Sequence, residues 1–277
     1  MKIGIDLGGT RLHVALIKNN RIVREIRTAH KKKDKRSLLE ELTSSIEKLI
    51  NKDVKGIGIG VAGLVRNGKI VYSPNLKNLN EINLKKLIQN RFKVKVVIEN
   101  DVNCFALWQG KKQQVKNLVC LTLGTGVGGG IVIDGKLYKG EDFAGELGHM
   151  VINEDGIKER SGKQGTLEAY CSGFGIEKRY HSLTRKRKSV VEIGKSKNKT
   201  AKKVIGETGR CLGIGLANIV NILNPEVIVV GGGIASIGAL FPAAKKEMRK
   251  RILRGVKVRV VQNKIKGSTA LGAASLV

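Results

Sequence analysis

Two aspartates stand where apolar stretches of the chain end, and both have the chemistry of a base or a metal ligand. Asp101 follows the stretch VVIEN, so its carboxylate projects from the fixed end of an expected strand, as a general base requires. Asp6 ends the first apolar stretch, just before the turn Gly8–Thr10, where it is placed to hold Mg²⁺ directly or through water. Each also has a structural alternative: Asp101 as N-cap of a helix over Val102–Gln109, and Asp6 as an acceptor for turn amides.

A second candidate feature is the stretch LTLGTGVGGGIVI, which places five glycines in the seven positions from Gly124 to Gly130. Glycine weakens a strand interior, so such a cluster marks a turn, a bulge or a backbone that approaches a ligand closely. The earlier stretch IDLGGTRLHVALI, from Ile5 to Ile17, has the same plan of strand, Gly/Thr turn and strand. Two copies predict two similar domains whose turns present backbone N–H groups to a phosphate chain. A plain glycine-rich hairpin is the alternative.

Other glycine motifs fit this sequence less well. The letters GTGVGG have the spacing of a dinucleotide-binding loop, but that loop opens a helix, whereas strand-like apolar residues follow here. The stretch GLVRNGK, residues 63–69, imitates a Walker A loop but is followed by isoleucine where Ser or Thr is needed. Within it, Asn67-Gly68 instead predicts a two-residue hairpin turn.

The periodicity of apolar residues predicts an alternating α/β protein that begins with a three-stranded meander. Strand-like segments are Lys2–Leu7, Arg11–Ile17, Ile22–Arg27, Gly56–Val61, Val94–Ile98, Leu118–Leu123, Gly130–Ile133, Val227–Val230 and Val256–Val261. Helices are expected after a capping box at Ser37–Glu40 and at Ile82–Gln89, Val102–Gln109, Leu167–Tyr180, Ala201–Leu223, Ala239–Leu253 and Thr269–Ser275. The polar, basic segment Thr184–Thr200 predicts an exposed loop or a poor helix.

Composition limits the class of protein. The chain has 277 residues, 41% of them hydrophobic, which is enough for one large or two ordinary globular domains. Asp6 interrupts the first apolar stretch and asparagines break a later one, LGIGLANIVNIL, so neither a signal peptide nor a membrane span is expected. The four cysteines lie far apart without a Cys-x-x-Cys pair, which suits reduced thiols. We therefore expect a soluble, cytoplasmic protein with no membrane partner.

The charge of the chain is unusual, because 52 Lys and Arg against 23 Asp and Glu give a formal net charge of +29. The basic runs are spread along the chain, at residues 31–33, 185–188, 195–203 and 245–251. A nucleic-acid site would gather them in one stripe, with aromatic side chains if the target were RNA, and aromatics are only 4% here. Solvated lysine faces explain the charge better than a nucleic-acid partner, although the charge favours encounter with anions such as nucleotides.

Six motifs together resemble the ROK family of repressors and sugar kinases, within the phosphotransferases that have actin-like ATPase domains. In chain order they are DLGGT (Asp6–Thr10), ENDVN (Glu99–Asn103), LGTGVGGG (Leu123–Gly130), AGELGH (Ala144–His149), GTLEAYCSG (Gly165–Gly173) and VIVVGGGI (Val227–Ile234). The resemblance implies two actin-like, ribonuclease H-like α/β domains with a substrate cleft between them. Their expected bounds are residues 1–115 with 266–277, and residues 116–265. It also implies ATP-dependent phosphorylation of a hexose with Mg²⁺.

The resemblance also implies a role for each site residue. Asp101 takes the proton from the sugar hydroxyl as that oxygen attacks the γ-phosphate of ATP, and Asp6 holds Mg²⁺ directly or through water. The residues expected to bind the sugar are Gly63, Asn100, Asp101, Glu146, His149 and Glu168. The residues expected around ATP are Asp6, Gly8, Gly9, Thr10, Gly124, Thr125, Gly126, Gly231, Gly232 and Gly233. Taken alone, His149 would be a structural histidine, and the last three glycines a strand-to-helix turn. Ala62 replaces the proline that the family usually has before Gly63, which would loosen that turn.

The sequence therefore predicts a hexose kinase, with glucose as the best single candidate. Other hexoses and N-acetylhexosamines, such as fructose, N-acetylmannosamine and N-acetylglucosamine, stay open because no residue excludes them. The family's repressors carry a DNA-binding helix-turn-helix ahead of DLGGT, where this chain has five residues. A regulator or nucleic-acid-binding protein without catalysis is a further class, which the intact Asp101 disfavours. By analogy with the family, a homo-oligomer, either dimer or tetramer, is expected.

One loop departs from the family pattern. Many members follow Gly-His with Cys-x-Cys-Gly-x-x-Gly-Cys-Leu-Glu, whose three cysteines bind zinc together with the histidine. At the cysteine positions this chain has Glu159, Ser161 and Thr166. One carboxylate and two hydroxyls are a poor ligand set for zinc, so we expect no zinc. His149 would then serve the sugar, and the loop 153–165 would be held by hydrogen bonds or be more mobile.

Overall fold

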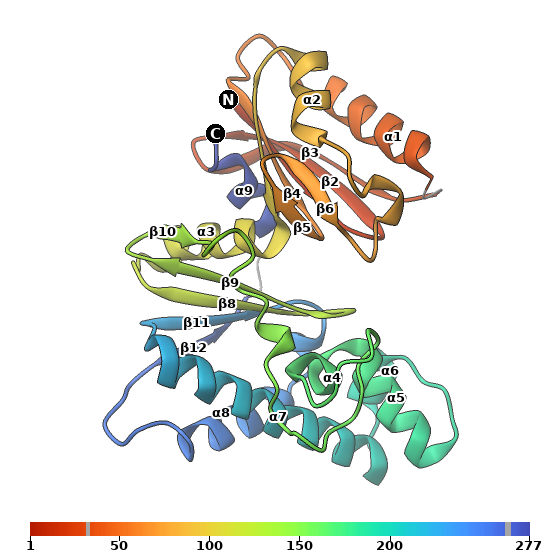
Figure 1. Cartoon of the computed structure of the whole chain (residues 1–277), viewed down its shortest axis with the longest axis vertical. Helices are drawn as coiled ribbons and strands as arrows, with labels where there is room; N and C mark the ends of the chain where they lie inside the picture. The colour runs from red at the N-terminus through yellow and green to blue at the C-terminus, as the bar shows by residue number, and fades with distance from the viewer. Residues whose placement is uncertain (32–33, 264–266) are drawn as a thin grey trace. The chain divides into compact units, whose positions relative to one another are not determined.

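The computed structural model describes residues 1–31, 34–263 and 267–277 (Figure 1). Lys32 and Lys33 of the first basic run lie outside the described residues, as does the expected domain boundary between residues 265 and 266. The chain divides into two compact units, which are described separately below. Unit 1 comprises Met1–Gln114, Gly130–Ala144 and Ile265–Val277, and unit 2 comprises Val115–Gly129 and Gly145–Lys264.

Unit 1 is built on a five-stranded sheet in the order β3-β2-β1-β4-β7. Its strands are β1 (Lys2–Leu7), β2 (Arg11–Lys18), β3 (Arg21–Ala29), β4 (Gly56–Val61) and β7 (Lys95–Asn100). The first three form the predicted antiparallel meander, and β4 and β7 add parallel to β1. Because β1, β4 and β7 are parallel, the residues that follow all three lie at one edge of the sheet.

Helices cover both faces of this sheet (Figure 1). On one face lie α1 (Lys35–Glu47) and α2 (Leu84–Phe92), whose apolar residues share the main core with the strands. The other face carries α3 (Asp101–Gln113) and α9 (Ser268–Ala274). The buried residues of that second core are Ala15, Ile17, Ala270, Leu271 and Ala274, with Trp108 of α3 packed against them.

The C-terminal helix α9 lies unusually close to its neighbours because glycines face it. A Cβ added at Gly58 of β4 would lie 1.8 Å from the carbonyl oxygen of Ala273. Within α9 itself, a Cβ at Gly272 would lie 1.7 Å from the carbonyl oxygen of Cys104 in α3. These contacts join backbone to backbone, so no side-chain movement relieves a larger residue.

A small hairpin follows β4 in unit 1. It consists of β5 (Leu64–Arg66) and β6 (Lys69–Tyr72), with the short 3₁₀ turn η1 (Lys77–Leu79) after it. Its turn residues Asn67 and Gly68 have φ angles of 51° and 79°, the left-handed conformation of a two-residue hairpin turn. The prediction of a hairpin turn, rather than a Walker A loop, is confirmed at this point.

The second sheet has the order β10-β9-β8-β11-β12. Its strands are β8 (Leu118–Leu123), β9 (Val127–Ile133), β10 (Lys136–Tyr138), β11 (Val227–Gly231) and β12 (Arg259–Gln262). As in the first sheet, three strands consecutive in sequence neighbour one another, and two parallel strands follow on the far side of the first of them. The two sheets thus repeat one topology, which confirms the duplication suggested by the two Gly/Thr stretches.

Residues Gly130–Ala144, expected in the C-terminal domain, group instead with unit 1. The physical reason lies in the contacts of this segment. A Cβ at Gly130 would lie 2.8 Å from the carbonyl oxygen of Val102 in α3, and Lys139 Nζ lies 3.3 Å from Glu99 Oε2. The first boundary between the two units lies between Gln114 and Val115.

Unit 2 is rich in helices, with a long α7 (Lys199–Leu223) packed along α8 (Leu240–Arg249) (Figure 1). Before them come α4 (Leu167–Cys171), α5 (Gly173–Thr184) and α6 (Val190–Lys195), and the 3₁₀ turns are η2 (Leu147–His149) and η3 (Ile234–Ser236). No helix of the described residues is long and apolar enough to span a bilayer. All four cysteines are buried and unpaired by disulfides.

Three expectations about helices are wrong. The cap of α1 is Asp34, whose side chain accepts from Ser37 N at 2.9 Å, so the Ser37–Glu40 pattern lies inside the helix and is no capping box. The expected helix Leu167–Tyr180 is two helices, because Ser172 adopts an extended conformation and caps α5 through Gly175 N. The segment Thr184–Thr200 contains α6, which has a true capping box.

Some strand ends differ from the sequence prediction, and two of these differences bear on the site. Strand β7 runs on to Asn100, so Asp101 follows it directly as the first residue of α3. Strand β9 begins at Val127, so three glycines of the cluster lie within the strand and the turn itself is short. Strand β12 begins only at Arg259, three residues after the expected start at Val256.

Candidate active site

Two adjacent polar residues form the turn between β7 and α3. The Asn100 side chain accepts hydrogen bonds from Val102 N at 2.8 Å and Asn103 N at 3.1 Å, so Asn100 is the N-cap of α3. Asp101 is the first residue of the helix, and its Oδ1 accepts from Val102 N at 3.0 Å. The capping role considered for Asp101 therefore belongs to Asn100.

Hydrogen bonds hold the turn at Gly63, which follows β4 at the same sheet edge. Asn100 Nδ2 donates to the Gly63 carbonyl at 3.1 Å, and Ser73 Oγ donates to the Ala62 carbonyl at 2.6 Å. Ala62 N also donates to the Leu7 carbonyl at 3.1 Å. Hydrogen bonds thus hold this turn, which lacks the proline of the family pattern.

Asp6, near the end of β1, is a partly buried carboxylate. Burial raises its pKa to about 6, against the opposing effect of the Arg27 charge. Asp6, Asp101 and the adjacent Glu99 all contribute to the raised pKa of the Cys104 thiol, after burial as the main cause. Carboxylates thus stand near the end of β1 and directly after β7, and a carboxylate oxygen suits a hard cation such as Mg²⁺.

The first Gly/Thr turn, Gly8–Thr10, is anchored by a histidine that the sequence analysis missed. His30 Nε2 lies 2.9 Å from the Gly8 carbonyl oxygen, and His30 N donates to the Thr10 carbonyl at 3.0 Å. The other ring nitrogen, Nδ1, lies 2.9 Å from Glu41 Oε2 of α1. The His30 side chain is only 1% exposed. A lone histidine in a basic stretch gave no signal of this role.

The second Gly/Thr turn, in unit 2, uses its glycines for close contacts. Gly124 N donates to the Gly126 carbonyl at 2.9 Å, and the Gly124 carbonyl accepts from Gly173 N at 2.8 Å. A Cβ at Gly126 would lie 2.6 Å from Glu168 Oε2, whereas one at Gly124 would meet nothing within 4 Å. After β11, Gly232 has a φ of 91° and packs its Cα against the Leu123 carbonyl. The two glycine turns of unit 2 are therefore neighbours.

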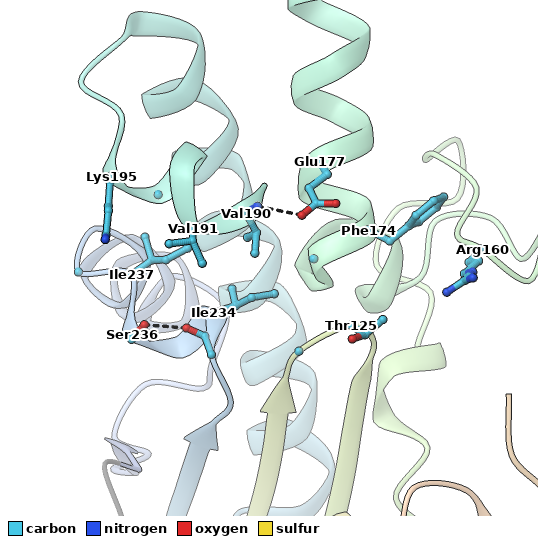
Figure 2. A pocket seen from close by; sticks show the side chains of 15 residues that line it. Thr125, Arg160, Phe174, Glu177, Val190, Val191, Lys195, Ile234, Ser236 and Ile237 are labelled. Carbon is cyan, nitrogen blue, oxygen red and sulfur yellow. Dashed lines mark hydrogen bonds between the residues drawn. The ribbon is translucent and has the colours of Figure 1, made fainter. Parts of the chain in front are cut away.

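A cavity of about 720 Å³ opens beside these turns, within unit 2 (Figure 2). Of the residues expected around ATP, Gly124, Thr125 and Gly233 line it. Its other walls come from the start of α5, from α6 and from the turn η3. One wall of the cavity is thus a glycine turn suited to phosphate, and the sequence analysis did not identify the other walls.

Apolar side chains form much of this cavity. In Figure 2, Val191, Ile234 and Ile237 come together on one side of the cavity, and Phe174 lies across from them. Glu177 Oε1 accepts from Val190 N at 2.8 Å, which ties the start of α6 to α5. Helix α6 arises from the segment expected to be a loop or a poor helix. Its signal was the pattern Ser-x-x-Glu at residues 189–192, half hidden among basic residues.

Basic side chains stand at the cavity as well, since Arg160 and Lys195 are among its lining residues (Figure 2). A cavity with apolar walls, two cations and exposed backbone at a glycine turn has the chemistry to hold a nucleotide. The apolar part suits a flat base, and the glycine turn and cations suit phosphates.

The residues expected to bind the sugar from unit 2 lie together. His149 Nε2 is 3.8 Å from Glu146 Oε2, and Nδ1 on the other side of the ring is 3.5 Å from Glu159 Oε1. Glu168 Oε2 accepts from Val127 N at 2.7 Å. Burial raises the pKa of Glu168, the Val127 N–H opposes this, and the neighbouring Glu159 carboxylate adds to it.

The described residues contain no group of three or more His, Cys, Asp or Glu side chains arranged to hold a metal ion. Around His149 the structure places the carboxylate of Glu159, with the hydroxyls of Ser161 and Thr166, and these do not form a zinc ligand set. Mg²⁺ makes a different demand, because it is usually held by one or two carboxylates together with substrate phosphates. Asp6 would be such a carboxylate ligand for Mg²⁺.

Comparison with known proteins decides the family. The model of the ROK family matches residues 2–277. The chain belongs to the ROK family. A xylose repressor from Caldicellulosiruptor bescii is 33% identical over 99% of this chain and 77% of the relative. An N-acetyl-D-glucosamine kinase from Mannheimia succiniciproducens is 32% identical over 100% of this chain and 99% of the relative.

A solved structure has the same fold as this ROK protein. The ROK family glucokinase from Streptomyces griseus, in complex with glucose and AMPPNP, superposes with a TM-score of 0.84 at 26% identity. The match covers 100% of this chain and 98% of that chain. The protein therefore has the mixed α/β, two-domain actin-like fold, as its sequence motifs predict.

Proposed function

We propose that this ROK protein transfers the terminal phosphoryl group of ATP to a hydroxyl of a hexose, with glucose to glucose 6-phosphate as the best single assignment. The observation that carries the proposal is the turn between β7 and α3. There Asn100 takes the capping role, and the Asp101 carboxylate stands at the helix N-terminus, where it accepts from Val102 N. The Streptomyces griseus glucokinase, solved with glucose and AMPPNP, supports the choice of substrates.

In the proposed reaction, the Asp101 carboxylate accepts the proton of the sugar hydroxyl as the hydroxyl oxygen attacks the γ-phosphorus. The bond from that phosphorus to the β,γ-bridging oxygen breaks, and ADP leaves. Asp6 would hold Mg²⁺ directly or through water, and the bound ion would supply neutralisation of the phosphate charge. Phosphoryl transfer demands mainly alignment and charge neutralisation, so a single well-placed base is sufficient.

The nucleotide is assigned to the cavity of unit 2. The apolar side chains of Val191, Ile234 and Ile237 would contact the base, and Gly124–Gly126 would contact phosphates. In unit 1 the anchored turn Gly8–Thr10 would contribute further backbone N–H groups to phosphate. The glycines 231–233 would border the adenosine, with Gly233 lining the cavity.

The residues that we propose to bind the sugar are Gly63, Asn100 and Asp101 of unit 1, and Glu146, His149 and Glu168 of unit 2. Polar groups that pair with the hydroxyls of the correct sugar disfavour molecules that cannot pair with them, which would give the site its selectivity. Kinases of N-acetylglucosamine, another hexose or N-acetylmannosamine are the alternatives within this class, supported by the N-acetyl-D-glucosamine kinase among the relatives.

Incubation with Mg-ATP and a panel of hexoses and N-acetylhexosamines, with products identified by mass, tests the proposal. A sugar phosphate formed together with ADP is the expected product, and glucose is expected to react fastest. The repressor relative favours one candidate of another class, a regulator that binds sugar without turnover. Sugar-dependent thermal stabilisation without any phosphorylated product from the panel would support that regulator and contradict the kinase.

We further propose that the protein is a homo-oligomer. Two apolar side chains of unit 2 are strongly exposed in the single chain, Ile222 at 75% and Leu253 at 73%. Light scattering coupled to size-exclusion chromatography is expected to give a mass near two or four chains, and a mass of one chain of 30.1 kDa would contradict the proposal.

A further inference from the structure

The buried carboxylate of Glu159 lies at the centre of a polar cluster in unit 2. Its side chain is 1% exposed. Ser161 Oγ donates to Glu159 Oε1 at 2.6 Å, and Thr166 Oγ1 donates to Oε2 at 3.3 Å. The Nδ1 atom of His149, buried as well, lies 3.5 Å from Oε1. A buried carboxylate is tolerated only when it is hydrogen-bonded or paired, and the two hydroxyls donate to it, whereas His149 Nδ1 lies beside it without a hydrogen bond.

The members of this cluster are the positions at which the family pattern has three cysteines and a histidine. The four side chains still come together in this chain, but around a carboxylate instead of a metal ion. The hydroxyls of Ser161 and Thr166 point their protons at Glu159, so they serve as donors to it. Zinc would need deprotonated thiolates or imidazole nitrogens at these positions.

The cluster connects the loop to the helix that carries Glu168. Thr166 Oγ1 also accepts from Ala169 N at 3.2 Å, and Thr166 is the N-cap of α4. Within the loop, Glu159 N donates to the Lys163 carbonyl at 2.9 Å, and Gly162 N to the Glu159 carbonyl at 3.2 Å. Glu159 thus lies beside the ring of His149, makes backbone hydrogen bonds within its own loop and accepts from Thr166, the N-cap residue of α4.

We propose that Glu159 is a positioning residue that replaces a structural metal: its carboxylate holds the loop 153–165 closed and orients His149 and Glu168 toward the sugar. The role of His149 and Glu168 rests on the proposed function, whereas the closing of the loop does not. Two independent measurements can therefore separate a failure of this inference from a failure of the kinase assignment.

Hydrogen–deuterium exchange tests the loop without reference to activity. Glu159→Gln removes the charge that attracts both hydroxyls, and Glu154→Gln is the matched control, since Glu154 is an exposed carboxylate of the same loop. We expect faster exchange for peptides within residues 150–166 in Glu159→Gln only. Ser161→Ala and Thr166→Val are expected to give smaller changes in the same peptides, which keeps the test open if Glu159→Gln does not fold. Unchanged exchange in all three variants would overturn the inference.

Kinetics test the positioning role with the most reactive sugar of the panel. Displacing an orienting contact by a fraction of an ångström to 1 Å typically costs up to about 100-fold, so Glu159→Gln is expected to lower kcat/KM for the sugar by about 10- to 100-fold. The loss should lie mainly in the KM for sugar, with the KM for Mg-ATP within about twofold of wild type. A variant with an open loop but unchanged sugar KM would contradict the positioning role.

Metal content provides the decisive contrast. Wild-type protein purified without added metal is expected to contain no stoichiometric zinc. The triple variant Glu159→Cys, Ser161→Cys, Thr166→Cys, which restores three thiols beside His149, is expected to bind about one zinc per chain. Wild-type protein with about one zinc, whose removal by chelator speeds exchange in the loop, would overturn the proposal. So would a folded triple variant that binds none, because the four positions would then not converge on one point.

Discussion

The Glu168 carboxylate is partly buried in the folded protein, and this burial disfavours its charged form. Its oxygen packs on Gly126 and accepts from Val127 N, while burial and the adjacent Glu159 raise its pKa. A folded-state pKa above the unfolded value means that the charged form destabilises the fold at neutral and higher pH. Such a cost is understandable where the carboxylate serves a sugar and not the fold.

Glu168→Gln is therefore expected to raise the melting temperature while it weakens sugar binding. The amide keeps an oxygen for Val127 N and carries no charge. The gain in stability should be full above the folded-state pKa and should disappear as the pH falls to the ordinary glutamate range of about 4, where the wild-type side chain is also neutral. Thermal unfolding between about pH 8 and about pH 4 measures it. A variant less stable than wild type at about pH 8 would show that the charge stabilises the fold.

His30 joins the turn Gly8–Thr10, which we propose contacts phosphate, to Glu41 of α1, through a ring that is almost fully buried. His30→Ala leaves the Gly8 carbonyl and the Glu41 carboxylate without this partner, so a loss of about 1–3 kcal/mol in the free energy of unfolding is expected. The freed turn should also raise the KM for Mg-ATP more than the KM for sugar. Equal changes in the two constants would contradict a role at the phosphate turn.

Residue types and spacing identified the candidate reacting groups but not the residues that hold them. Asn100 and Asp101 are neighbours, and either side chain has the length to cap α3. Only the positions of Val102 N and Asn103 N show that Asn100 is the cap. His30 lies about twenty residues from the turn it anchors, and no local pattern connects the two.

At the scale of elements, α9 packs so closely against its neighbours in unit 1 that a larger residue has little room at the glycine contacts. Gly272→Ala would place a Cβ 1.7 Å from the Cys104 carbonyl oxygen, and backbone on both sides has to move. We expect a loss of about 1–3 kcal/mol or more in the free energy of unfolding of this unit, measured by urea denaturation.

Gly206→Ala is the matched control for this substitution. Gly206 lies within α7, and a Cβ there would meet nothing within 4 Å. Because alanine is favoured over glycine in a helix, the control is expected to stabilise the protein by about 0.4–1 kcal/mol. Equal effects of the two substitutions would show that helix propensity, and not close packing, decides the result at Gly272.

The helices around the cavity show which features the apolar pattern of the sequence could not predict. The apolar pattern over Leu167–Tyr180 is continuous, so it gave no reason to break the helix at Ser172. The break arises from tertiary contacts, since Gly173 N donates to the Gly124 carbonyl and Ala169 O lies 2.0 Å from a Cβ added at Gly175. Likewise α6 was obscured by the basic residues around it, although its capping box was present in the sequence.

At the scale of the whole molecule, the charge of +29 is expected to act on encounter with the nucleotide. Attraction of an anion by a basic protein weakens as salt shortens the Debye length. The KM for Mg-ATP should therefore rise roughly several-fold between about 50 mM and about 500 mM salt. The hexose is uncharged and provides an internal control, because its KM should stay unchanged. A salt-independent KM for Mg-ATP would contradict this effect of the charge.

The duplicated topology was the part of the whole molecule that the sequence predicted best. Two Gly/Thr stretches with the same plan pointed to two similar domains, and the two sheets do repeat one strand order. The assignment of Gly130–Ala144 to unit 1 could not be predicted, because it depends on contacts with α3 and with Glu99 that are distant in sequence. Sequence periodicity predicts strands but not the unit against which a hairpin packs.

The comparison of wild type with Asp101→Asn tests the central claim most directly. Asn100 caps α3, so the variant should fold with a wild-type melting temperature and bind sugar and nucleotide. Phosphorylation of the best sugar of the panel, followed as sugar phosphate and ADP formed in equal amounts, should fall by roughly 10²–10⁴ from loss of the base. A folded Asp101→Asn protein with near wild-type turnover would contradict the account, because Asp101 would then take no part in the chemistry.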